Sequence, residues 1–254
     1  MKVVRIRTEG DEIAYGVAEP EGIALYRGTP FVAWEPTDTI IPFDEAHLLS
    51  PVFPTKVVCV GRNYAEHADE LGNEVPDEPV IFIKPSTSVI GPGAPIVLPP
   101  ESAEVHHEAE LAVVVAKVSH RVAAEDAASH IFGYTAGNDV TARDLQRKDG
   151  QWTRGKGFDS FCPLGPAIET ELDPAGLRIS CEVNGDLRQE ASTYDMVFGV
   201  AELFAFVSRV MTLLPGDVIL TGTPSGVGPI RAGDRVEVTI ERIGTLANPV
   251  VAGS

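Results

Sequence analysis

The sequence has few cysteines, a shortage of positive charge and no long apolar run. Its three cysteines, Cys59, Cys162 and Cys181, show no C-x-x-C spacing, so they indicate neither a disulfide framework nor a zinc site. No segment reaches the ~18 consecutive apolar residues of a membrane span. Charges interrupt the first residues, MKVVRIRTEGDE, where a signal peptide would need an apolar core. We therefore expect a cytoplasmic protein with no membrane partner.

The formal net charge of −17 argues against nucleic acid as a partner, because a polyanion is repelled by an acidic protein. One segment is rich in positive charge despite the acidic composition of the chain. Residues 143–156, here called the cationic rim, hold five of the chain's 20 Lys and Arg residues. The rim could be a solvated surface loop, or it could attract an anionic substrate. Its position, beginning four residues after Asp139, favours the second interpretation.

Two domains are predicted from the distribution of strand-like runs and prolines. At 254 residues and 44% hydrophobic content, the chain can bury a full core. Residues 1–50 alternate short strand-like runs with turns, and SPVFPT is typical of a linker. We predict a small β-rich N-terminal domain with its linker over residues 1–55 and a larger catalytic domain over residues 56–254. The fold class expected is mostly β (α+β).

Three further elements stand out within the larger predicted domain. Residues 105–118 read as one long strand, and residues 177–190 as a hairpin with a type I′ turn at Asn184-Gly185. Residues 197–214 read as one long helix, stopped by Pro215-Gly216. The apolar stripe of that helix is expected to be core: Val197, Val200, Ala201, Phe204, Val207 and Met211.

Glu108 and Glu110 stand two residues apart in a strand-like run, so their side chains should project from the same face. Two adjacent carboxylates repel each other, and beside an AVVV run both are partly desolvated at a cost. A hard cation such as Mg²⁺ removes both costs because it prefers oxygen ligands. The alternative is that this pattern marks only the solvated face of a strand. His106 shares that face, which leaves a softer His/carboxylate iron site open.

Asp139 follows another strand-like run and should open a short helix, DVTARDLQ. Arg143 and Gln146 would then share one helical face with it. An Asp at such a junction is commonly a helix N-cap. It could equally bind a metal while the guanidinium and the amide hold a carboxylate ligand.

His67 and Glu70 are three residues apart on a predicted short helix, so the Glu could fix the His tautomer and form a general base. An incidental surface pair is the alternative. The segment GDVILTGTPSGVG lacks the G-K-[ST] of a nucleotide-binding loop, and a strand rather than a helix follows it. Its glycines would instead bring the backbone close to a ligand, with Thr223 offering a hydroxyl.

Taken in order, these segments resemble the fumarylacetoacetate hydrolase superfamily, and its acylpyruvate hydrolase branch in particular. The resemblance rests on VGRNYAEHADELG, IFIKPSTSV, HHEAELAVVV, GNDVTARDLQ, WTRGKGFDSFCPLGP, VNGDLRQ and GDVILTGTPSGVGP. It implies a mixed β-roll catalytic domain, a homodimer and a Mg²⁺ or Mn²⁺ site on Glu108, Glu110 and Asp139. By the same matching, His67, Glu70 and Lys156 take catalytic positions, and Arg143, Gln146 and Thr223 take substrate positions. His106 matches no ligand in the family pattern.

The resemblance implies cleavage of a C–C bond in a small anionic 2-oxo acid of the acylpyruvate type, giving pyruvate and a carboxylic acid. The same site could isomerise 2-hydroxyhepta-2,4-diene-1,7-dioate or decarboxylate oxaloacetate. A non-catalytic dicarboxylate binder is the more distant alternative. Hydrolysis is favoured because His67 and Glu70 are both present to activate water.

Overall fold

The computed structural model describes residues 1–70, 72 and 74–253, and the chain they form is mostly β, as predicted. The largest sheet is 12-stranded and follows the order β4-β3-β2-β1-β14-β12-β11-β17-β6-β7, with β5 beside β1 and β8 beside β14. Its strands are β1 (Lys2–Arg7), β2 (Ile13–Glu19), β3 (Gly22–Thr29), β4 (Ala33–Ile41), β5 (His47–Leu48), β6 (Val57–Gly61), β7 (Val80–Lys84), β8 (Val89–Ile90), β11 (Ala109–Val115), β12 (Ile131–Asn138), β14 (Cys162–Glu169) and β17 (Val218–Leu220).

Two smaller sheets complete the fold. A five-stranded sheet contains β16 (Asp186–Ser192), β15 (Arg178–Val183), β19 (Arg235–Ile240), β20 (Gly244–Ala252) and β9 (Ile96–Leu98). A three-stranded sheet contains β13 (Thr141–Ala142), β10 (Val105–His107) and β18 (Gly228–Pro229). The α-helices in the described residues are α1 (Ala65–Glu70), α2 (Arg143–Asp149), α3 (Thr153–Lys156) and α4 (Val200–Val210). Short 3₁₀ turns occur at η1 (Phe43–Glu45), η2 (Ser86–Ser88), η3 (Ala124–His130) and η4 (Thr193–Asp195).

Strand β11 lies at the centre of the core, and both of its faces are buried. Leu111, Val113 and Val115 point into the core shared with the five-stranded sheet and α4, whereas Ala112 and Val114 pack on the opposite side. This explains the continuous apolar run, since a strand covered on both faces needs no polar alternation. Each fully buried Val or Leu side chain contributes roughly 1.5–3 kcal/mol, so β11 is a rigid support for the residues that precede it.

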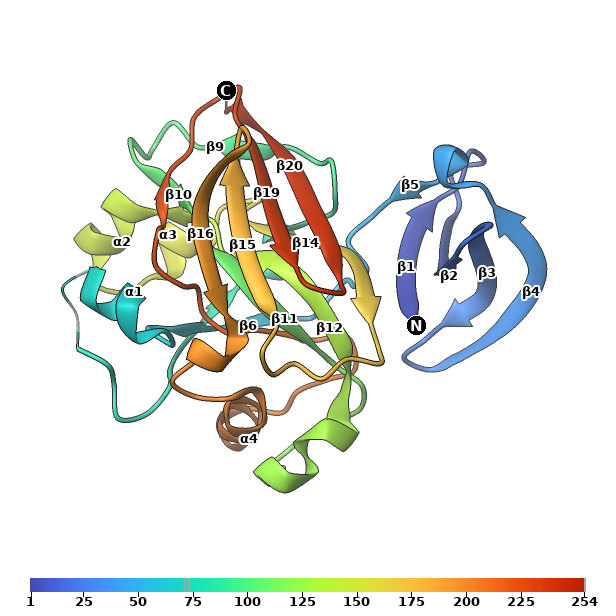
Figure 1. The fold of residues 1–254 in the computed structure, drawn as a ribbon, viewed down its shortest axis with the longest axis horizontal. Helices are drawn as coiled ribbons and strands as arrows, with labels where there is room; N and C mark the ends of the chain where they lie inside the picture. Colours follow the sequence, from blue (N-terminus) through green and yellow to red (C-terminus); the bar gives the residue numbers. More distant parts are fainter. Residues whose placement is uncertain (71, 73, 254) are drawn as a thin grey trace.

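The N-terminal strands β1–β4 form an antiparallel meander that lies to one side of the rest of the molecule (Figure 1). The meander joins the large sheet through β1 and β14, where Lys2 pairs with Glu169 and Val3 with Ile168. The residues of the predicted linker include Thr55, whose backbone N–H and hydroxyl both donate to the buried Asp217 carboxylate. The domain boundary at residues 55 and 56 stays a prediction.

The hairpin prediction is confirmed: β15 and β16 are joined by Asn184 and Gly185, with φ of 57° and 84°, as a type I′ turn requires. The helix prediction was too long, because α4 spans only Val200–Val210. Within the predicted stripe, Phe204 and Val207 are buried, whereas Val197 is 37% exposed.

Two other local predictions were wrong in detail. The strand predicted over residues 105–118 is divided at Glu108 into β10 and β11. Asp139 does not open a helix, because β13 intervenes and α2 begins only at Arg143. Asp139 therefore lies in the turn after β12, and the shared helical face predicted for it holds only for Arg143 and Gln146. Among the described helices, none combines the length and apolar character needed to cross a membrane.

Candidate active site

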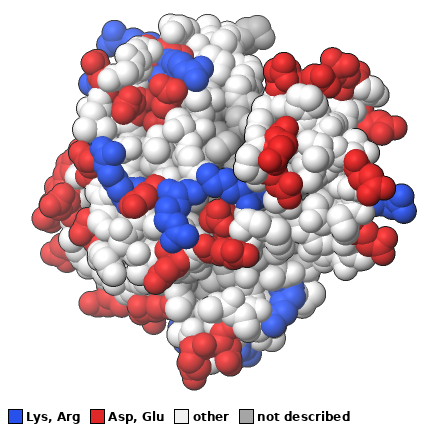
Figure 2. All heavy atoms as spheres, turned by 45° about the vertical axis from the view of Figure 1, so that its right-hand side comes forward, with Lys and Arg blue, Asp and Glu red and all other residues white. Residues whose placement is uncertain are grey.

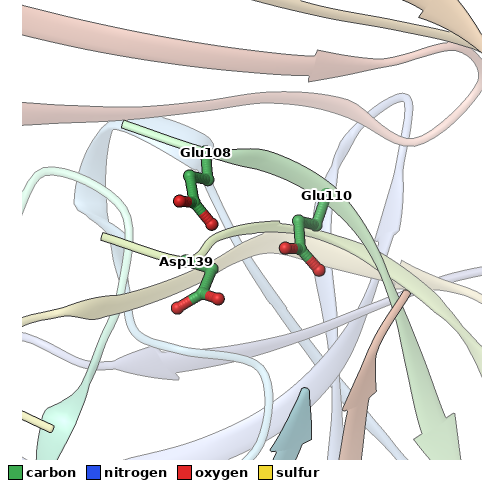
Figure 3. A group of neighbouring side chains, drawn as sticks. All are labelled: Glu108, Glu110 and Asp139. Carbon is green, nitrogen blue, oxygen red and sulfur yellow. The ribbon is translucent and has the colours of Figure 1, made fainter. Parts of the chain in front are cut away.

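Three buried carboxylates converge where β10, β11 and β12 meet. Glu108 lies between β10 and β11, Glu110 is the second residue of β11, and Asp139 directly follows β12. Glu110 pairs in register with Gly137 of the neighbouring strand, and the Asp139 backbone N–H donates to the Glu108 carbonyl at 2.9 Å. The three side chains point toward one another (Figure 3), and ligand oxygens from all three lie within 4.8 Å of one another.

Three cations hold two of these carboxylates. The Lys156 ammonium donates to Glu108 Oε2 and to Asp139 Oδ2, at 2.7 Å in each case. Arg143 also pairs with Glu108, and Lys84 pairs with Asp139. All of these side chains are at least 95% buried, so the pairs act in a poorly screened environment. Three carboxylates and three cations bring the formal charge of the cluster to zero.

Glu110 is the least compensated of the three carboxylates. One of its oxygens accepts a hydrogen bond from the Gly222 backbone N–H at 2.7 Å. Burial, followed by the charges of Asp139 and Glu108, raises the pKa of Glu110 well above its usual range. Burial acts on Glu108 in the same direction, but Lys156 and Arg143 outweigh it and lower the pKa of Glu108.

This arrangement fits a divalent cation. Clustered carboxylate oxygens are the donors that Mg²⁺ and Mn²⁺ prefer. Glu110, buried and short of a counter-charge, gives the group an electrostatic reason to accept one. Glu108, Glu110 and Asp139 could therefore hold the ion. His106 is not part of this group, since its Nε2 lies 3.0 Å from Glu104, and this arrangement does not support an iron site at His106.

The carboxylates open into a cavity of about 250 Å³. Five of the other predicted site residues line it: His67, Arg143, Gln146, Lys156 and Thr223. Arg143 donates to Gln146 Oε1 at 2.6 Å, so one guanidinium links Glu108 to this amide.

Glu70 supports His67 from behind the cavity wall. His67 is 6% exposed, and its Nδ1 lies 3.1 Å from Glu70 Oε2, as expected for residues three apart on α1. The same carboxylate accepts hydrogen bonds from the Gly226 backbone N–H. Glu70 is thereby fixed between α1 and the glycine-rich segment, and it can orient the imidazole so that Nε2 remains available to a ligand.

Several residues of the site escaped the sequence analysis. Lys84 could have been predicted, because it is the only charged residue of the mostly apolar strand β7, and a cation buried in such a run needs a partner of opposite charge. Phe82 and Trp152 form an aromatic wall, with ring centroids 5.1 Å apart. Gln189 places Thr223 by donating to its hydroxyl at 2.8 Å, although β16 lies far from Thr223 in the chain.

The cationic rim is partly neutralised by its neighbours. Arg147 lines the cavity and pairs with Glu104, and Arg154 pairs with Asp149. Figure 2 shows acidic side chains at most margins of one face of the molecule, in keeping with the net charge of −17. The cationic rim is therefore a local concentration of positive charge on a protein whose net charge is −17.

Residues 56–251 match the family model described as "Fumarylacetoacetate (FAA) hydrolase C-terminal". The chain belongs to the fumarylacetoacetate hydrolase family. Residues 1–51 match a second model, "Rv2993c-like, N-terminal". The resemblance found in the sequence motifs is therefore confirmed at the level of the family.

Relatives within the fumarylacetoacetate hydrolase family have different activities. The chain is 48% identical over 225 residues to the human mitochondrial oxaloacetate tautomerase FAHD2B, which covers 84% of this chain and 72% of that protein. It is similar to the structure of 5-carboxymethyl-2-hydroxymuconate delta-isomerase from Mycobacterium smegmatis, at 48% identity, a TM-score of 0.94 and full coverage of both chains. Maleylpyruvate hydrolase from Sphingobium sp. SYK-6, in complex with manganese(II) and pyruvate, aligns at 34% identity and a TM-score of 0.82, again over both full chains.

Proposed function

We propose that this protein is a divalent-metal-dependent hydrolase that cleaves the C–C bond of acylpyruvates, giving pyruvate and a carboxylic acid. One observation carries the proposal: the carboxylate group and the His67 side chain, with Glu70 behind it, face the same cavity. A metal site alone would suit many ligands. A metal site beside a positioned imidazole suits a reaction that needs an activated water.

Glu108, Glu110 and Asp139 would hold Mg²⁺ or Mn²⁺. When bound, such an ion supplies Lewis-acid stabilisation of the negative charge that develops on the 2-keto oxygen. Arg143 and Gln146 are joined by a hydrogen bond, and in this proposal they hold the substrate's 1-carboxylate. The Lys156 ammonium, which donates to Glu108 and Asp139, would stabilise the same developing charge.

His67 would act as the general base that activates water. Its imidazole takes a proton from water as the oxygen attacks the 4-keto carbon, and Glu70 stabilises the imidazolium that forms. The C3–C4 bond then breaks, and its electron pair moves into the C2–C3 enolate. Protonation at C3 by the imidazolium gives pyruvate, and the attacked carbon leaves as a carboxylic acid. Hydrogen atoms and charge balance over this sequence without a further reactant.

The maleylpyruvate hydrolase relative supports this reading, because its complex contains manganese(II) and pyruvate. The second candidate function is proton transfer or decarboxylation on a 2-oxo or 2-hydroxy-diene diacid. The tautomerase and isomerase relatives favour it. These reactions need an electron sink and a proton carrier but no attacking water.

A substrate panel with Mg²⁺ distinguishes these functions: acylpyruvates, oxaloacetate and a hydroxymuconate-type diene, followed by enol absorbance and pyruvate release. We expect the parent protein to release pyruvate from acylpyruvates. His67→Ala should lower that rate by roughly 10²–10⁴-fold, since this is the usual contribution of a positioned general base. Decarboxylation of oxaloacetate should fall far less.

Glu70→Gln serves as the graded variant, because glutamine can still hydrogen-bond His67 but cannot stabilise its cation. Its loss should be smaller than that of His67→Ala. Equal loss of both activities in His67→Ala, with Mg²⁺ binding intact, would remove the assignment of His67 as the base for water. Turnover of any of these substrates would exclude the remaining alternative, a non-catalytic metal-dependent binder of small dicarboxylates.

A further inference from the structure

Arg62 has a backbone conformation that arginine rarely adopts. It directly follows β6, and its φ is +60°. A side chain in this left-handed region costs free energy, and it persists only where the surrounding structure fixes it. On one side stands Gly61, where an added Cβ would lie 2.7 Å from the Trp152 ring. The turn therefore presses directly against the aromatic wall of the cavity.

Asn63 fixes the other side of this turn. Its side chain is fully buried and donates hydrogen bonds to the carbonyl oxygens of Phe198 and Thr221, at 3.1 and 2.7 Å. Its Oδ1 also accepts from the Phe198 backbone N–H at 2.8 Å. With both neighbours held, the strained conformation of Arg62 is maintained at the wall of the cavity, which Arg62 lines.

Arg62 differs from the other cations that line this cavity. Arg143 and Lys156 pair with Glu108, and Arg147 pairs with Glu104 at the rim. Within residues 1–70, 72 and 74–253, no carboxylate oxygen lies within 4.0 Å of the Arg62 guanidinium. A partly buried arginine facing a cavity without an acidic partner is suited to an anion supplied by a ligand.

We infer that Arg62 binds a second carboxylate, at the acyl end of the substrate, and so selects acylpyruvates whose acyl group is itself acidic. This inference rests on the proposed function, in which the pyruvate end lies at Glu108, Glu110 and Asp139. The metal-ligand carboxylates and Arg62 line the same cavity of about 250 Å³, so one short dianionic substrate can reach both. Phe82 and Trp152 give the cavity an aromatic wall, and apolar surroundings strengthen a charge-assisted bond to the guanidinium.

Two substrates test this selection: succinylpyruvate and butanoylpyruvate, which differ only in that a methyl group replaces the terminal carboxylate. The measurement is the ratio of their kcat/KM values. Arg62→Met should lower the ratio by roughly 10–100-fold, as loss of charge-assisted hydrogen bonds to a carboxylate predicts. Arg62→Lys should recover part of the ratio, because it keeps the charge but not the planar fork. Arg121→Met is the matched control, since Arg121 is also an arginine with a positive φ, 54°, but lies outside the rim and does not line the cavity.

Arg62→Gly guards against a folding defect, because glycine suits the backbone at φ +60° while removing the same guanidinium. It should show the same loss of ratio as Arg62→Met. If the parent cleaves both substrates and the ratio stays unchanged in Arg62→Met and Arg62→Gly, the inference fails and the proposed function stands. An equal fall in Arg121→Met would also overturn it, because the effect would then come from the overall charge of the protein and not from the cavity. A parent that cleaves neither substrate overturns the proposed function itself.

Discussion

Replacing Lys156 by methionine tests whether an internal ammonium takes the place of a metal ion. Lys156 donates to Glu108 and Asp139 and is 2% exposed. Removing it leaves three buried carboxylates facing two cations, Arg143 and Lys84. We therefore expect Lys156→Met to destabilise the metal-free protein, and we expect Mg²⁺ to stabilise the variant more than the parent.

The expected loss of stability in Lys156→Met depends on the ion pairs that remain. Breaking a buried ion pair typically costs 3–5 kcal/mol, and the lower end, about 3 kcal/mol, applies because Glu108 and Asp139 each keep one cation. For a chain of this size 1 kcal/mol shifts Tm by ~2–4 °C, so the metal-free variant should melt about 6–12 °C below the parent. A bound ion restores the missing charge, and its stabilisation grows with its affinity for the folded state.

Thermal unfolding in EDTA and in millimolar Mg²⁺ measures both effects. The matched control is Arg178→Met, which breaks the exposed pair with Glu190 and should cost no more than ~1 kcal/mol. If Lys156→Met melts within about 2 °C of the parent in EDTA, a difference of ~1 kcal/mol or less, the ammonium does not stabilise the carboxylates. If Mg²⁺ raises the Tm of both proteins equally, the ion and the ammonium do not compete.

Four further predictions address the rim, the cavity wall, the strained turn and assembly. The kcat/KM for a dianionic substrate should fall as salt concentration rises, since screening acts within ~8–10 Å. Replacing Arg147 and Lys148 by Glu should remove most of that salt dependence. A kcat/KM of the parent that does not change with salt would mean that the rim is only a solvated loop. Gly61→Ala should raise KM severalfold, because the new Cβ would lie 2.7 Å from the Trp152 ring and displace it; an unchanged KM would show that this wall does not contact substrate. Arg62→Gly should raise Tm by ~2–4 °C, because relief of left-handed strain is worth about 1 kcal/mol; a Tm that falls would show that the side chain stabilises the fold. Light scattering at micromolar concentration should give a homodimer, and a 27.1 kDa particle would contradict this.

Sequence reasoning succeeded where structure depends on a few adjacent residues. Asn184-Gly185 predicted its hairpin because a two-residue turn needs two positive φ angles. Glu108 and Glu110 were expected on one face, since strand side chains alternate with a period of two. Both carboxylates do point into the same group.

It failed where distant segments decide the local conformation. The helical apolar spacing continues past Val210, but Leu213 pairs instead with Ser119 and draws its segment out of α4. The contact of Lys84 with Asp139 spans 55 residues, and no short pattern encodes it. The closure of β13 onto β10 likewise separates Asp139 from the helix that seemed to follow it directly.

The neutral carboxylate cluster has a consequence for the order of events during biosynthesis. A domain such as a zinc finger gains its folding free energy from the metal and stays unfolded without it. Here Lys84, Lys156 and Arg143 already neutralise the acidic residues. We therefore expect that a newly made chain can complete its fold in a compartment poor in free divalent ions and be loaded later. Its abundance would then be independent of metal supply, and only its activity would follow that supply.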